Sequence, residues 1–131
     1  MGKVMVGLGA MLVAFVLAMS GWAFDTQKAL DGEVAKEPTQ LQCGPGHVAG
    51  AVVARVVTKK DDVLYTVFFN MKTKLAIVVK HDAEGNPVEI AFGKLVANED
   101  GVHFIVKAMM NADDAMKAFP DPCDYLAPAE A

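Results

Sequence analysis

After residue 20 the chain contains no serine, and it offers few of the groups that enzymes use as nucleophiles. Its only two cysteines would be unavailable if they form a disulfide. Paired carboxylates occur at Asp61 and Asp62 and at Asp113 and Asp114, where a turn and a helix start account for them. No glycine motif that cradles phosphate is present. The sequence therefore predicts a protein that is not an enzyme and that uses no cofactor.

Clusters of basic residues are also missing. The chain has 12 basic and 16 acidic residues, a formal charge of -4, and its adjacent pair Lys59 and Lys60 is followed at once by two aspartates. Proteins that bind nucleic acid neutralise phosphates with clustered Lys and Arg. Nucleic acid is therefore not an expected partner.

The spacing that would hold a metal is absent from the sequence. The three histidines, His47, His81 and His103, fall at separate strands or strand ends, and no Cys or His pair has the spacing of zinc ligands. Cys43 begins a Cys-Gly-Pro run, as in a thioredoxin-like motif, but residue 46 is glycine where a second cysteine is required. We expect neither a metal site nor a redox motif.

The first 23 residues have the layout of a secretory signal peptide. Lys3 precedes an uncharged apolar run over residues 4–19, and small residues follow at Ser20, Gly21 and Ala23. Cleavage after Ala23 or after Ser20 fits this pattern. An uncleaved anchor is the alternative, because the run approaches the roughly 20 residues that span a bilayer. We expect a periplasmic or extracellular protein that meets a membrane only through this segment.

Export would place Cys43 and Cys123 in an oxidising compartment, so the sequence predicts a disulfide between them. Closing a loop of about 80 residues contributes up to about 4.5 kcal/mol in the chain-entropy description. Residues 24–42 are polar and contain a glycine and a proline, and we expect them to form a flexible leader before the domain.

Between residues 48 and 107, apolar runs separated by turn residues predict five antiparallel strands in meander order. The expected strands cover residues 48–58, 63–70, 74–80, a fourth run after Pro87 with a bulge near Gly93, and residues 102–107. Residues 74–80 alternate, which predicts one solvent-exposed face.

One C-terminal helix is expected after these strands, with Asn111 as its N-cap and with Pro120 and Pro122 as its stop. The predicted fold class is therefore mainly β (α+β), a five-stranded antiparallel sheet or half-barrel with one helix and one disulfide. The domain covers residues 43–124, and residues 125–131 form a tail.

Residues 48–58 raise a conflict between composition and position. The strand is apolar on both faces, with Arg55 as its only charge, yet meander order places it at the edge of the sheet. Pairing with the same strand of a second copy would cover that edge, and we expect a homodimer of this kind. Closure of the sheet into a barrel or a different strand order are the alternatives.

These features favour a small exported binding or interaction module without catalysis, whose partner is a second copy or another envelope protein. The alternative is a carrier of a small apolar ligand in a curled sheet. The side chains expected to meet that ligand or form the interface are Val53, Val57, Phe68, Phe69, Phe92 and Phe104. An apolar cavity of roughly a few hundred Å³ would favour the carrier.

Overall fold

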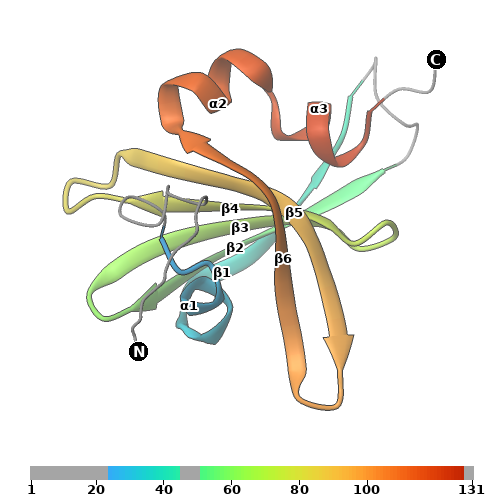
Figure 1. The fold of residues 1–131 in the computed structure, drawn as a ribbon. Coiled ribbons are helices and arrows are strands. Elements are labelled where there is room, and N and C mark those ends of the chain that lie inside the picture. Colours follow the sequence, from blue (N-terminus) through green and yellow to red (C-terminus); the bar gives the residue numbers. More distant parts are fainter. Residues whose placement is uncertain (1–23, 45–50, 129–131) are drawn as a thin grey trace, which may run out of the picture.

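The computed structural model describes residues 24–44 and 51–128 (Figure 1). In this part of the chain six antiparallel strands form one sheet, in the order β1-β2-β3-β4-β5-β6. The strands are β1 (Glu33–Gln42), β2 (Val52–Lys60), β3 (Val63–Asn70), β4 (Leu75–His81), β5 (Pro87–Asn98) and β6 (Gly101–Asn111). The helices are α1 (Gln27–Asp31), α2 (Ala112–Ala118) and α3 (Pro122–Leu126). The predicted mainly β antiparallel class is confirmed, with six strands instead of five.

The additional strand is β1, which lies in the segment expected to be a flexible leader. Its backbone pairs with β2, and every one of its residues is exposed. A strand held by backbone pairing alone shows no apolar alternation that a sequence could reveal. Pro38 lies where the pairing shifts register, between Lys36 and Thr39, a position that sheets tolerate for proline. The structure thus corrects the leader predicted for residues 24–42, because α1 and β1 occupy it.

The position of β1 also removes the expected dimer contact. β2 has β1 on one side and β3 on the other, so its edge is already paired within the same chain. The prediction that this strand pairs with a second copy is therefore wrong. The strand predicted for residues 48–58 also starts later than expected, because β2 begins at Val52. Residues 45–50 and the predicted signal peptide lie outside the described part of the chain.

Both faces of the central strands are buried. On one face, Val53, Ile77 and Phe92 belong to a core that α2, α3 and the disulfide cover. On the other, a second core includes Ala76 and Val78, both 0 % exposed, beneath α1 and the far half of the β5–β6 hairpin. The exposed face predicted for residues 74–80 is therefore wrong, because α1 was not expected there.

A bulge lets the β5–β6 hairpin contribute to both cores. The pairing of β5 with β6 shifts register between Phe92 and Gly93, which confirms the predicted bulge. A Cβ atom at Gly93 would overlap the backbone carbonyl of Ile105, so only glycine permits this approach. Beyond the bulge the hairpin bends away from α2 (Figure 1), and Phe104 of β6 enters the second core.

The helix after β6 begins as predicted, but a second helix follows it. The Asn111 side chain accepts a hydrogen bond of 2.9 Å from the backbone N–H of Asp114 and so caps α2. After a short break α3 starts at Pro122, where a proline needs no hydrogen-bonded N–H. The predictions of a single helix and of a tail from residue 125 are corrected, because Leu126 is 0 % exposed at the end of α3.

The predicted disulfide is confirmed. Cys43, directly after β1, is bonded to Cys123 of α3 with their Cα atoms 5.8 Å apart. The crosslink fastens the C-terminal helices to the sheet near the start of β2. Within the described residues, none of the helices has the length and apolar character needed to cross a bilayer.

Candidate functional site

A cavity of about 430 Å³ lies between the sheet and the segment that contains α2 and α3. We call it the sheet cavity. The first part of its floor is a row of cross-strand neighbours from β2 to β5, Arg55, Phe68, Ile77 and Phe92. Residues directly opposite one another in antiparallel strands point to the same face, so the pairing register alone builds this row.

A second row runs beside the first and completes the floor. It consists of Val57, Thr66, Val79 and Ile90, again direct neighbours from β2 to β5. Lys36 of β1 is paired with Val57 and therefore extends this row by one strand. The two rows are apolar except at the end formed by β1 and β2 and at Thr66.

The roof of the sheet cavity comes from α2 and from the residues that follow it, including Ala115, Met116 and Phe119. The ring centroid of Phe119 lies 4.9 Å from that of Phe92 and 5.4 Å from that of Tyr125. Tilted and edge-on ring contacts of this kind stabilise an aromatic cluster beyond simple burial. One end of the cavity is therefore lined by the rings of Phe92 and Phe119.

Tyr125 fixes this aromatic cluster to the bulge. Its hydroxyl group donates a hydrogen bond of 3.1 Å to the backbone carbonyl of Gly93. Burial raises the pKa of the Tyr125 hydroxyl above its ordinary value of 10.0, so the group stays protonated and neutral at physiological pH. The roof thus adds no charge at this end.

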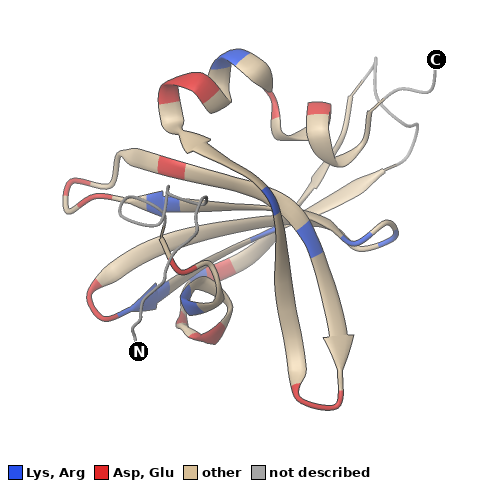
Figure 2. Ribbon diagram, in the orientation of Figure 1, with Lys and Arg blue, Asp and Glu red and all other residues tan. Residues whose placement is uncertain are grey.

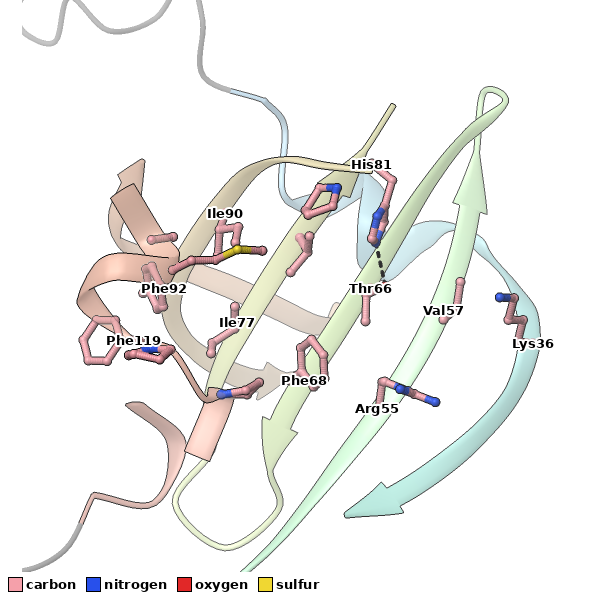
Figure 3. A pocket seen from close by; sticks show the side chains of 16 residues that line it. Lys36, Arg55, Val57, Thr66, Phe68, Ile77, His81, Ile90, Phe92 and Phe119 are labelled. Carbon is pink, nitrogen blue, oxygen red and sulfur yellow. Dashed lines mark hydrogen bonds between the residues drawn. The ribbon is translucent and has the colours of Figure 1, made fainter. Parts of the chain in front are cut away.

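The opposite end of the sheet cavity is basic. Figure 3 shows Lys36 and Arg55 on one side of the cavity and Phe92 and Phe119 on the other. Neither cation forms an ion pair with another described residue. None of the described lining residues is Asp or Glu. The acidic residues lie elsewhere, many of them at the hairpin turns and on the helices (Figure 2).

A threonine and a histidine add one polar spot to the cavity wall. The Nε2 atom of His81 lies 2.8 Å from Oγ1 of Thr66 (Figure 3). Its Nδ1 atom lies 3.1 Å from the carbonyl oxygen of Gly85. A carbonyl oxygen only accepts, so Nδ1 is the donor, and in the neutral ring Nε2 accepts from the threonine hydroxyl. The hydroxyl hydrogen of Thr66 is then engaged in the bond to His81 and is not available to a ligand.

The structure brings together three of the six residues expected at a ligand site or interface. Val57, Phe68 and Phe92 line the sheet cavity, and Val53, 1 % exposed, lies in the core on the same face. Phe69 and Phe104 lie on the opposite face. Phe68 and Phe69 are consecutive in one strand, so their side chains must point to opposite faces.

A second cavity, of about 460 Å³, lies on that opposite face between α1, the first strands and the β5–β6 hairpin. Its walls are mostly apolar, with Val56 and Phe69 among them. The hydroxyl of Thr58, one of its polar groups, already donates to the backbone carbonyl of Ala29 at 2.6 Å. Ligand sites combine apolar walls with a few convergent polar groups, and the sheet cavity meets this description better.

The histidines do not gather into a metal site in the part of the chain that the structure describes. No group of three or more His, Cys, Asp or Glu side chains there is arranged to hold a metal ion. His81 is hydrogen-bonded as above, His103 lies on β6 opposite Val96, and His47 is outside the described residues.

Two functional candidates were missing from the residues predicted for a site, namely Lys36 and Arg55. Lys36 belongs to β1, which the sequence does not reveal. Arg55 is the only arginine of the chain and interrupts the otherwise apolar residues 52–57, on the same face as Val57. That isolated charge was the available signal.

Searches with this chain among protein families, curated proteins and solved structures found no match. The functional proposal therefore rests on the chemistry of the sheet cavity.

Proposed function

We propose that this protein is an exported carrier that binds a small, mainly apolar ligand in the sheet cavity. The observation that supports the proposal best is the cavity itself, about 430 Å³ with aliphatic and aromatic walls. Small-molecule sites commonly measure about 300–1,000 Å³ and have walls of this kind. The binding needs no catalytic group.

The construction of the cavity supports a carrier, because its walls are held in place without a ligand. The floor consists of residues in hydrogen-bonded strands. The roof is fastened by the disulfide, by the bond from Tyr125 to Gly93 and by a bond of 2.8 Å from the Asn70 side chain to the carbonyl of Leu126. A preformed site loses less conformational entropy when a ligand binds.

Export is part of the same proposal. The disulfide is compatible with an oxidising compartment outside the cytosol. The signal-peptide layout of residues 1–23 agrees with this location. A carrier outside the cytosol would sequester an apolar compound from water or deliver it to another envelope component.

A neutral fluorescent probe, N-phenyl-1-naphthylamine, tests the carrier function without relying on charge. We expect saturable fluorescence enhancement in the wild-type protein and its loss in Val57→Phe, which places a ring in the sheet cavity. Val56→Phe is the matched control, because Val56 is the neighbouring residue of β2 and lines the second cavity. Probe binding that survives Val57→Phe and disappears in Val56→Phe, or no binding to the wild-type protein, would contradict the proposal.

The interaction module without catalysis remains a second candidate, on a different observation. Val96 of β5 and Ile105 of β6 are 36 % and 47 % exposed and share one face of the far half of the β5–β6 hairpin. Exposed apolar side chains that lie together are typical of interaction sites. Sedimentation equilibrium with the wild type and Ile105→Lys would test self-association, and identical monomeric behaviour of the two would leave another envelope protein as the partner.

A further inference from the structure

One of the two cations that line the sheet cavity is an arginine, and this residue type indicates which anion the cavity would bind. The chain has 12 basic residues, and Arg55 is its only arginine. This residue heads the first row of the cavity floor, directly opposite Phe68. The guanidinium group presents a rigid set of N–H donors that matches a carboxylate in a bidentate manner, which a lysine cannot do.

The described surroundings of Arg55 leave its guanidinium group available to bind a carboxylate. Its side chain is exposed and forms no ion pair with another described residue. Lys36 lines the same end, and the described lining contains no acidic side chain, although acids outnumber bases in the whole chain. Two cations without a counter-charge at one end of an apolar cavity are complementary to a ligand with one anionic end.

The length of the floor limits the shape of such a ligand. The first row crosses three strand spacings from Arg55 to Phe92, or about 14 Å at about 4.8 Å per spacing. An extended alkyl chain advances about 1.3 Å per carbon, because its zigzag bonds are about 1.5 Å long, so about eleven carbons cover this distance. The far end meets the rings of Phe92 and Phe119.

We propose that the ligand of the sheet cavity is a linear alkyl monocarboxylate, with its carboxylate at Arg55 and Lys36 and its chain directed towards Phe92 and Phe119. The inference rests on the proposed carrier function and names the chemical class of the ligand. Arg55 provides the bidentate contact, Lys36 adds a second positive charge, and the two apolar rows accept the chain.

Isothermal titration calorimetry with decanoate, decan-1-ol and decyltrimethylammonium tests the charge. We expect decanoate to bind at least about tenfold more tightly than decan-1-ol, since a hydrogen bond to a charged group contributes strongly to binding. The cationic analogue should bind more weakly still. Between octanoate and decanoate, affinity should rise about threefold to fourfold per methylene, the amount expected for its burial.

Substitutions at the basic end identify the residues responsible. Arg55→Ala should weaken decanoate binding by at least about tenfold and leave decan-1-ol unchanged. Arg55→Lys should retain part of the affinity, because the charge remains and the bidentate geometry is lost. Lys107→Ala is the control, since it removes an exposed positive charge that does not line this cavity. Arg55 is exposed, so its replacement leaves the core intact.

The outcomes separate this inference from the carrier function. Equal affinity for decanoate and decan-1-ol, with no effect of Arg55→Ala, would overturn the carboxylate assignment while the carrier function stands. Decanoate affinity that stays at the wild-type value in both Arg55→Ala and Lys36→Ala would overturn it equally. If the neutral probe also fails to bind, the carrier function itself is refuted.

Discussion

The Nδ2 atom of Asn70 donates a hydrogen bond of 2.8 Å to the carbonyl oxygen of Leu126, and so joins the end of β3 to the end of α3. The Oδ1 atom of the same side chain accepts from the backbone N–H groups of Lys72 and Thr73, at 2.9 and 3.3 Å. Asn70 is 4 % exposed. One buried amide thus shapes the turn between β3 and β4 and holds α3 against the sheet.

Replacement of this amide should destabilise the protein strongly. Asn70→Ala removes three hydrogen bonds and leaves the Leu126 carbonyl without this donor, so we expect a loss of about 2–4 kcal/mol in the free energy of unfolding. Urea denaturation measures it. Thr73→Ala is the control: its hydroxyl accepts an exposed bond of 3.3 Å from Leu75, and its loss should cost less than about 1 kcal/mol. Similar effects of both substitutions would contradict the role assigned to Asn70.

The bulge should tolerate no side chain at Gly93. Gly93→Ala places a Cβ atom against the Ile105 backbone, which cannot yield as a flexible side chain could. We expect a loss of more than about 3 kcal/mol or failure to fold. Gly44→Ala is the matched control, because a Cβ there meets nothing within 4 Å. A Gly93→Ala protein as stable as wild type in thermal unfolding would show that the hairpin does not need this close approach.

The disulfide should contribute a large share of the stability and should support the cavity roof. The double variant Cys43→Ala with Cys123→Ala opens a link between positions 80 residues apart, and we expect a loss of about 2–5 kcal/mol in urea denaturation. Binding of the neutral probe should weaken as well, because α3 loses its covalent tie. Unchanged stability together with unchanged binding would mean that hydrogen bonds and packing alone hold the helices.

Export makes a prediction about the covalent form of the protein. Material purified from the exported fraction should begin at Gly21 or at Phe24 and should contain no thiol that reacts with iodoacetamide after denaturation. Intact-mass spectrometry reads both properties in one measurement. A mass that retains residues 1–20, or two alkylated cysteines, would contradict the proposed export.

Much of the sheet could be predicted because its strands carry their own apolar signal. Val63–Asn70 was expected with these bounds, and the bulge at Gly93 showed itself as a break in the alternation. The cap at Asn111 and the disulfide followed from local chemistry and from the compartment. β1 could not be predicted, since an exposed strand with a proline differs little from a polar linker. Because β1 was not predicted, the strand now known as β2 was expected at an unpaired edge of the sheet, and a dimer was predicted to cover that edge.

The candidate site was only partly predictable, because it depends on which side chains share a face across several strands. Phe68 and Phe92 were expected there, but their placement beside Arg55 follows from a pairing register that one sequence does not contain. The same register places Phe69 on the other face. The roof depends on α3, whose start at Pro122 resembled a helix stop in the sequence.

The disulfide also determines how the molecule would respond to a pulling force. Cys43 follows β1 and Cys123 lies in α3, so the strands from β2 to β6 form a covalent side loop between them. Tension applied between the two ends of the chain travels through α1 and β1, across the sulfur–sulfur bond and out through α3. Both rows of the cavity floor from β2 to β5 lie off this load path. Stretching would therefore unfold α1, β1 and the end of α3 and leave that floor mechanically shielded.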